Sequence, residues 1–275
     1  MKWLWRLLFP EEVPKVAGLL FVEPMQHYLE YGSCMMRHVI AANARPEFDV
    51  RELVDGDATL EGVRAALQAQ DPDFFFGLGH GAPCAYTVEC TELFMSVMSA
   101  THGGCDLDRN LDTMRGRVVH LNSCLTGQEL GPALIANGAR AYIGSRESFW
   151  FYIGGPPCAT RAEQAVFLCE YQVEVTLMAG LSVGQAWRDS QTRYDMEIEY
   201  WTVGEGRNHR DAAGVVRALR INKEIQVVLG DQGATVALSF LPPEFAAAAL
   251  PLGMAPLIAV GAVITFEELS KWLGW

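Results

Sequence analysis

Two side chains that together can perform covalent chemistry each stand at the end of an apolar run. His80 lies in the segment GLGHG, directly after the three phenylalanines at 74–76, and Cys124 lies 44 residues later at the end of VVHLNSC. A cysteine thiolate is a strong nucleophile, and a histidine beside it can take up a proton and later donate it to a leaving group. The pair therefore predicts nucleophilic cysteine catalysis, on condition that the fold brings His80 and Cys124 together.

The residues around this pair suggest how such a reaction would be supported. Gly81 has no side chain, so its backbone N–H can face an oxyanion beside the N–H of Cys124, and two such donors form an oxyanion hole. We also expect a helix to begin near Gln128, where the positive end of its dipole would stabilise the thiolate.

Other combinations of histidine and cysteine leave alternatives open. Five zinc-type ligands fall within 26 residues: His80, Cys84, Cys90, His102 and Cys105. Their spacing is poor for zinc, because His102 and Cys105 form the only close couple, and we predict no metal and no cofactor. His102 also begins a second His-Gly, but no strand precedes it, so we prefer His80 as the base. His120 lies inside the strand before Cys124 and is interpreted as a core histidine.

The elements that must position His80 and Cys124 are apolar strands that alternate with helices. Runs of strand character cover 17–24, 48–55, 73–80, 116–124, 139–145 and 224–231, and helical spacing covers 25–44, 58–70, 159–180 and 182–201. Thr59 is expected to cap the second of these helices. The alternation predicts an α/β fold, a three-layer α/β/α sandwich with a mainly parallel sheet. In such sheets chemistry collects at the carboxyl ends of the strands, where His80 and Cys124 would lie.

The order and spacing of these segments resemble the caspase-like cysteine peptidases, in particular the gingipain and CHAT-domain types. Their motif is an apolar run, His-Gly, a spacer, and a second apolar run that ends in a small residue and Cys, as in FFFGLGHG and VVHLNSCLTG. The likeness continues through ELGPALIANGARAYIGS, the GLSVGQA joint at 180–186, and NKEIQVVLGD. Gln232 replaces the proline that usually follows this last segment. The resemblance covers roughly residues 74–238.

The resemblance implies a caspase-like cysteine endopeptidase that forms a thioester acyl-enzyme on Cys124, with His80 as general base and acid and Gly81 as an oxyanion donor. It implies substrate-binding roles for four residues: Asn122, Ser123, Glu147 and Trp150. Metacaspases carry Asp at the position of Asn122 and select Arg or Lys, so basic selectivity is not expected. The same fold also serves as an inactive scaffold or a partner-binding subunit of a larger, membrane-associated assembly, and that alternative stays open.

Composition bears on partners and location. The net charge of −12 argues against a nucleic-acid partner, because phosphate contacts need a basic face. The expected partner is a protein or peptide substrate, with a further protein partner or a homo-oligomer left open. Seven irregularly spaced cysteines predict no disulfide framework, and hence a reducing, cytoplasmic location. Pro10 and the acidic residues after it interrupt the apolar N-terminus, so we expect no signal peptide.

The C-terminus is the most apolar part of the chain. Residues 245–266 carry no charge and are numerous enough to cross a bilayer, but two prolines and two glycines interrupt them. We therefore expect a caspase-like domain over 1–240 and an apolar extension over 241–275 that packs on protein. Membrane contact through 245–266 is the alternative.

Overall fold

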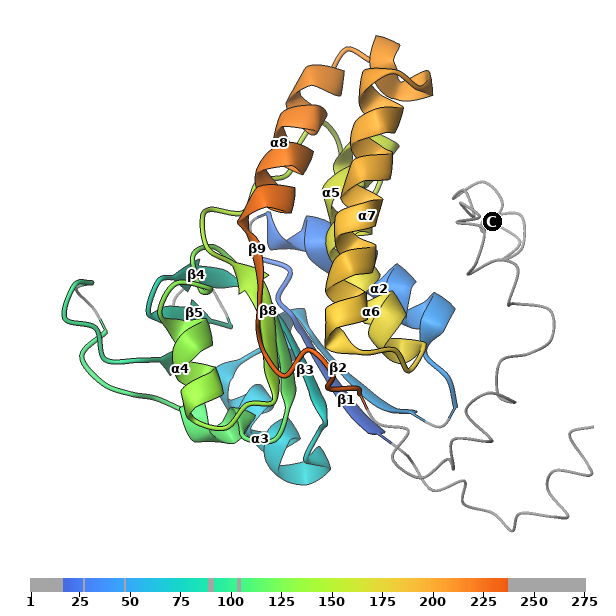
Figure 1. Cartoon of the computed structure of the whole chain (residues 1–275). Coiled ribbons are helices and arrows are strands. Elements are labelled where there is room, and N and C mark those ends of the chain that lie inside the picture. Colours follow the sequence, from blue (N-terminus) through green and yellow to red (C-terminus); the bar gives the residue numbers. More distant parts are fainter. Residues whose placement is uncertain (1–16, 27, 47, 89–91, 103–104, 237–275) are drawn as a thin grey trace, which may run out of the picture. The chain divides into compact units, whose positions relative to one another are not determined.

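A six-stranded sheet forms the centre of the computed structural model, which describes residues 17–236 except 27, 47, 89–91 and 103–104 (Figure 1). The strand order is β2-β1-β3-β7-β8-β9, and every neighbouring pair is parallel except β8 and β9. The strands are β1 (Ala17–Glu23), β2 (Phe48–Val54), β3 (Phe74–Leu78), β7 (Val118–Asn122), β8 (Ala141–Ser145) and β9 (Gln226–Gly230). The predicted mainly parallel sheet is confirmed, and its last strand is antiparallel.

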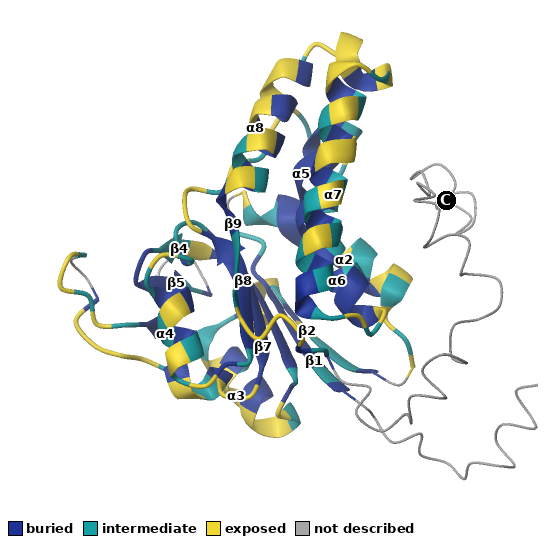
Figure 2. Ribbon diagram, in the orientation of Figure 1, coloured by how far each residue is buried: buried dark blue, intermediate teal, exposed yellow. Residues whose placement is uncertain are grey.

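Helices cover both faces of this sheet, which confirms the three-layer α/β/α arrangement. They are α2 (Leu29–Asn43), α3 (Leu60–Gln70), α4 (Leu130–Ala136), α5 (Arg161–Glu170), α6 (Gln172–Met178), α7 (Val183–Thr202) and α8 (Ala212–Ile225). Helices α3 and α4 pack on one face, and α2, α5 and α6 pack on the other. Helix α8 packs on α5 and α7 in a separate cluster. The four inner strands, β1, β3, β7 and β8, are almost entirely buried and form the dark central band of Figure 2, whereas the edge strands β2 and β9 are largely half-buried.

The run of three phenylalanines is divided between the two faces of the sheet. Phe74 and Phe76 pack with the α2 layer, and Phe75 packs with the α3 layer. Successive strand residues point to opposite faces, so a strand covered on both sides is apolar at every position. All five residues of β3 are buried, and this strand leads the chain directly to His80.

Several local predictions agree with the structure. The Thr59 side chain accepts a hydrogen bond from the Gly62 N–H at 3.0 Å, so it caps α3 as expected. The single helix predicted over 159–180 is divided at Tyr171 into α5 and α6, and Gly180 ends the second part with a φ of 84°.

Helix α8 and the small sheet of β4 (His80–Ala82), β5 (Ala85–Thr87) and β6 (Leu93–Ser96) were not predicted. Strands of three or four residues are too short to show a clear alternation.

The expectation that the chain lacks disulfides is wrong. Cys34 pairs with Cys158, and Cys84 pairs with Cys105. Cys124 and Cys169 are the free cysteines in the described part of the chain. The partners in the first pair are 124 residues apart, so their approach depends on how α2 packs against the loop before α5, which cysteine spacing does not reveal.

Three predictions concern segments outside the described residues: the N-terminal start, the domain boundary at 240, and the apolar run at 245–266. Within the described residues, no helix combines the length and the apolar character needed to cross a bilayer.

Candidate active site

His80 and Cys124 come from neighbouring strand ends. In the parallel pair of β3 and β7, Leu78 lies opposite Asn122, and the Gly79 N–H donates to the Asn122 carbonyl at 3.4 Å. His80 lies two residues after Leu78, and Cys124 lies two residues after Asn122. The strand register therefore places both at the same edge of the sheet. Both line one cavity there. The structure therefore brings the predicted pair together, with His80 exposed and Cys124 half-buried.

A tight turn presents the Cys124 side chain. Leu125 has a φ of 67°, a left-handed conformation that is rare for a residue with a bulky side chain. Its N–H donates to the Glu147 carbonyl at 3.0 Å, which holds the turn against the segment after β8. A non-glycine residue keeps this conformation only where its surroundings enforce it, and such positions gather at functional sites.

The sulfur of Cys124 has a backbone donor of its own. The Phe149 N–H donates to Sγ at 3.3 Å, and an N–H directed at sulfur stabilises negative charge on it. The helix expected near Gln128 is α4, which begins at Leu130 and has seven residues. A helix dipole acts mainly near the first turn, and Cys124 precedes the start of α4 by six residues. We therefore assign the stabilisation of charge on the sulfur to the Phe149 amide.

Gly81 fits against the backbone of Cys124 as only glycine can. A Cβ atom at Gly81 would lie 2.2 Å from the Cys124 carbonyl oxygen, far inside van der Waals contact. The absence of that atom allows β4 to pass beside Cys124. The Gly81 backbone therefore lies directly beside that of Cys124.

The remaining predicted site residues divide into two groups. Asn122 and Ser123 are buried and line the cavity with His80 and Cys124. The Asn122 side-chain amide donates to the Tyr171 hydroxyl at 3.1 Å, and the Ser123 hydroxyl lies 3.2 Å from that of Thr126.

Glu147 and Trp150 do not line this cavity. Glu147 is exposed and contributes only its carbonyl, to Leu125. The Trp150 backbone N–H donates to the Asn222 side chain at 3.0 Å, and the residue is 46% exposed. Phe149 and Phe151, on either side of Trp150, line the cavity instead. The sequence shows three consecutive aromatic residues at 149–151, and it does not reveal which of them face the cavity.

His120 belongs to a buried polar cluster behind the cavity. Its Nε2 lies 3.1 Å from a Glu170 oxygen, its Nδ1 bonds with Glu174, and the Tyr194 hydroxyl donates to Glu170 at 2.8 Å. Burial alone would lower the pKa of His120, but the two carboxylates outweigh it and raise the pKa to about 10. The interpretation of His120 as a core histidine with satisfied hydrogen bonds is confirmed.

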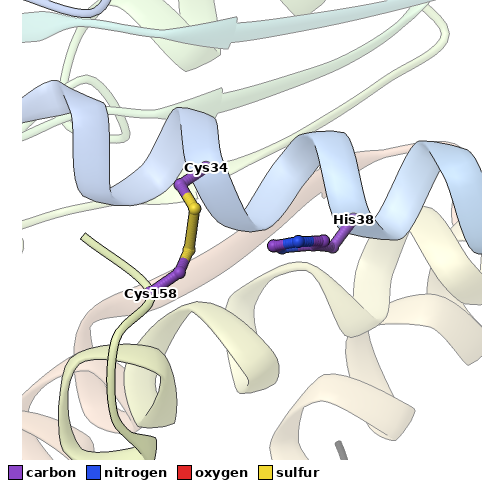
Figure 3. A group of neighbouring side chains, drawn as sticks. All are labelled: Cys34, His38 and Cys158. Atoms are coloured by element: carbon purple, nitrogen blue, oxygen red, sulfur yellow. A yellow bond between two sulfur atoms is a disulfide. The ribbon is translucent and has the colours of Figure 1, made fainter. Parts of the chain in front are cut away.

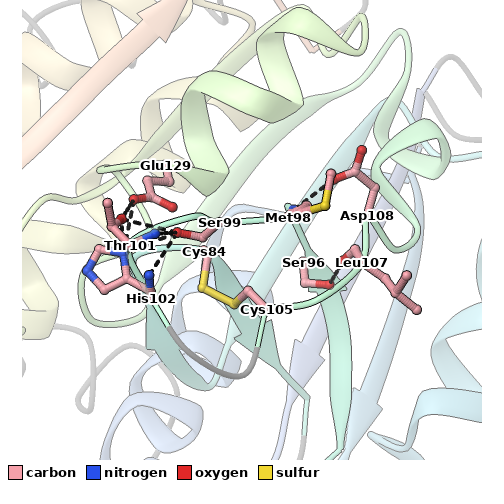
Figure 4. The surroundings of a disulfide bond; sticks show 10 residues. All are labelled: Cys84, Ser96, Met98, Ser99, Thr101, His102, Cys105, Leu107, Asp108 and Glu129. Atoms are coloured by element: carbon pink, nitrogen blue, oxygen red, sulfur yellow. Dashed lines mark hydrogen bonds and ion pairs between the residues drawn. A yellow bond between two sulfur atoms is a disulfide. The ribbon is translucent and has the colours of Figure 1, made fainter.

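His102, the alternative base, and two cysteines of the zinc alternative, Cys84 and Cys105, lie outside the cavity. His102 Nδ1 lies 3.0 Å from a Glu129 oxygen, beside the Cys84–Cys105 disulfide (Figure 4), and it does not line the cavity. Because Cys84 and Cys105 are bonded to each other, they are not available as ligands in the zinc alternative.

A different group of ligand-type side chains lies on α2. Cys34 and His38, one turn apart, lie near Cys158, and among the described residues these three alone form a cluster of metal-ligand type (Figure 3). The two sulfurs are joined in a disulfide there, so we assign no metal to this cluster.

Comparison with known proteins adds no assignment to this geometry. No protein-family model matches the chain, and no curated protein matches its sequence. The function of the site is therefore argued from its own residues.

Proposed function

We propose that this protein is a cysteine endopeptidase of the caspase-like group, with His80 and Cys124 as its catalytic dyad. One observation carries the proposal: the two residues lie just beyond the ends of two paired parallel strands, and both line one cavity. A nucleophile and a base in one cleft, with an amide donor at the sulfur, are the parts that acyl transfer to a thiol requires.

The proposed reaction has two halves. The Cys124 thiolate attacks a peptide carbonyl, the oxyanion is bound by the Gly81 and Cys124 amides, and His80 protonates the leaving amine. Water, activated by His80, then attacks the thioester, and the carboxylic acid product leaves as the thiol is restored. In this scheme no step needs a metal or a cofactor.

A peptidyl ketone electrophile tests the dyad directly. We expect covalent labelling of Cys124 in the wild type, and loss of at least 99% of the labelling rate in His80→Ala. Cys124→Ala should remove labelling and turnover while the thermal unfolding temperature stays close to that of the wild type, because the side chain is half-buried.

Cys169→Ala is the matched control, since this second free cysteine is fully buried and its thiol donates to the Ala165 carbonyl. Labelling should persist in the control. Equal labelling of several cysteines, or labelling of Cys124 that does not depend on His80, would instead favour the inactive scaffold.

A cytoplasmic location stays a prediction, and the two disulfides count against it. Disulfides persist in oxidising compartments and are rare where glutathione keeps thiols reduced. Rapid alkylation of the protein in intact cells, followed by mass spectrometry of the Cys34 and Cys84 peptides, measures their redox state. Free thiols at both positions would support the cytoplasm.

A further inference from the structure

The cavity beside Cys124 has apolar walls. Five large apolar side chains line it: Leu29, Leu78, Phe149, Phe151 and Phe167. No Asp, Glu, Lys or Arg is among the residues that line it. The two buried polar residues of the lining, Asn122 and Ser123, already have hydrogen-bond partners in the Tyr171 and Thr126 hydroxyls. Apart from the proposed catalytic pair, His80 and Cys124, a charged ligand group would therefore lose its hydration in this cavity without gaining an ionic partner.

The size of the cavity restricts its occupant further. Its volume is about 170 Å³. A cavity of roughly 150 Å³ lined by Leu, Ile and Phe is large enough to hold benzene. The space therefore suits one side chain of the size of leucine, methionine or phenylalanine.

Helix α2 sets the limit of the cavity on one side. Gly32 is one of the lining residues, and a Cβ atom there would lie 3.0 Å from a Leu78 methyl carbon and 2.6 Å from the Tyr171 hydroxyl. Glycine thus lets α2 lie close against the end of β3. The first turn of α2 therefore forms one wall of the cavity, with Leu29 and Gly32 among the lining residues.

The position of the cavity relates its occupant to the reaction. Cys124 and His80 are themselves lining residues, so a side chain that fills the cavity lies next to the carbonyl under attack. We propose that this protein cleaves peptides after a medium-sized apolar residue, leucine, methionine or phenylalanine. This inference rests on the proposed function, because it concerns the substrate of the same dyad.

A series of fluorogenic peptides that differ only in the residue before the scissile bond provides the test. The series contains Leu, Met, Phe, Ala, Arg and Asp at this position. We expect kcat/KM for the Leu, Met and Phe peptides to exceed the values for Arg and Asp by at least about 100-fold, since a charge is desolvated without a partner. The Ala peptide should fall between the two groups.

A pair of variants tests whether this cavity causes the preference for an apolar residue before the scissile bond. Leu29 is the first residue of α2 and is half-buried, and an acidic residue is favourable at a helix N-terminus. Leu29→Asp should raise the ratio of Arg to Leu cleavage at least about 10-fold, because it adds a carboxylate to the wall. Asn has nearly the same shape as Asp but no charge, so Leu29→Asn should leave the ratio of Arg to Leu cleavage as low as in the wild type. Circular dichroism and thermal unfolding check that both variants fold.

The outcomes separate this inference from the proposed function. If wild-type protein cleaves the series but prefers Arg or Asp, or shows no preference, the proposed apolar specificity is wrong and the proposed peptidase function still holds. If no peptide is cleaved, the labelling rates of Leu and Arg peptidyl ketones at Cys124 decide the specificity in the same way. Absence of both cleavage and labelling overturns the dyad, and the specificity with it.

Discussion

The Cys34–Cys158 disulfide joins the two sides of the proposed substrate cavity. Cys34 lies on α2, which contributes Leu29 to the cavity, and Cys158 lies in the segment that contributes Phe149 and Phe151. The Tyr31 hydroxyl also donates to a carbonyl of that segment, at Gly155. We predict that removal of this disulfide weakens both the stability of the fold and the binding of substrate.

The expected loss of stability follows from the length of chain that the disulfide closes. Cys34 and Cys158 are separated by 124 residues, and Cys84 and Cys105 by 21. The entropy that a cross-link removes from the unfolded chain corresponds to about 4.9 kcal/mol for the longer loop and about 3.4 kcal/mol for the shorter one. The first value is a large part of the roughly 5–15 kcal/mol that holds a typical domain folded.

Two double variants allow a matched comparison. Cys34→Ser with Cys158→Ser removes the bond that joins α2 to the Phe149 segment, and Cys84→Ser with Cys105→Ser removes a bond that does not join these two walls; none of the four cysteines lines the cavity itself. Urea unfolding should show the larger loss of unfolding free energy in the first variant. Its KM for a Leu peptide should rise several-fold, and more than in the second variant, because α2 and the Phe149 segment are no longer tied together. Equal losses of stability together with an unchanged KM would refute the reasoning.

Three further predictions concern single positions. Burial, with Glu52 nearby, raises the pKa of Glu23 from 4.5 to about 8, so the stability associated with its protonated form is present below pH 4.5 and is lost as the pH rises through 8. Urea unfolding at pH 9 should therefore show Glu23→Gln to be more stable than wild type by on the order of 4 kcal/mol, and the gain should vanish at pH 4. The raised pKa of His120 means that the fold favours its charged form, and the contribution of this group is complete below pH 6.5 and is lost as the pH rises through about 10. His120→Gln should cost about 3 kcal/mol at pH 6 and clearly less at pH 10.5, and a pH-independent difference would contradict the ion cluster. Gly81→Ala should reduce peptide hydrolysis at least about 100-fold, because the new methyl group displaces Cys124. Gly56→Ala, where a Cβ meets no atom within 4 Å, is the control and should keep wild-type hydrolysis.

The sequence alone predicts the layered fold and the two residues of the proposed dyad. Consecutive apolar residues stand at 74–76 in the strand at 73–80, and at Val118 and Val119 in the strand at 116–124, which is the pattern of strands covered on both faces. Because parallel strands meet at one edge with their carboxyl ends, the pattern also predicts that His80 and Cys124 lie on the same side of the sheet. The register of Leu78 with Asn122 agrees with this expectation. These inferences succeed because strand character and side-chain alternation depend on residues close together in the chain.

Only the tertiary structure decides what surrounds the dyad. The amide at the sulfur comes from Phe149, and the walls of the cavity combine α2 with the Phe149–Phe151 segment, which is more than 100 residues away in the chain. The pairing of Cys34 with Cys158 has the same origin, and cysteine spacing predicted the opposite. Glu147 and Trp150 have suitable side chains at a suitable distance along the sequence, but they do not line the cavity. Which side chain of a loop faces a cavity, and which two sulfurs meet, depends on packing between distant elements, and no local pattern of residues encodes it.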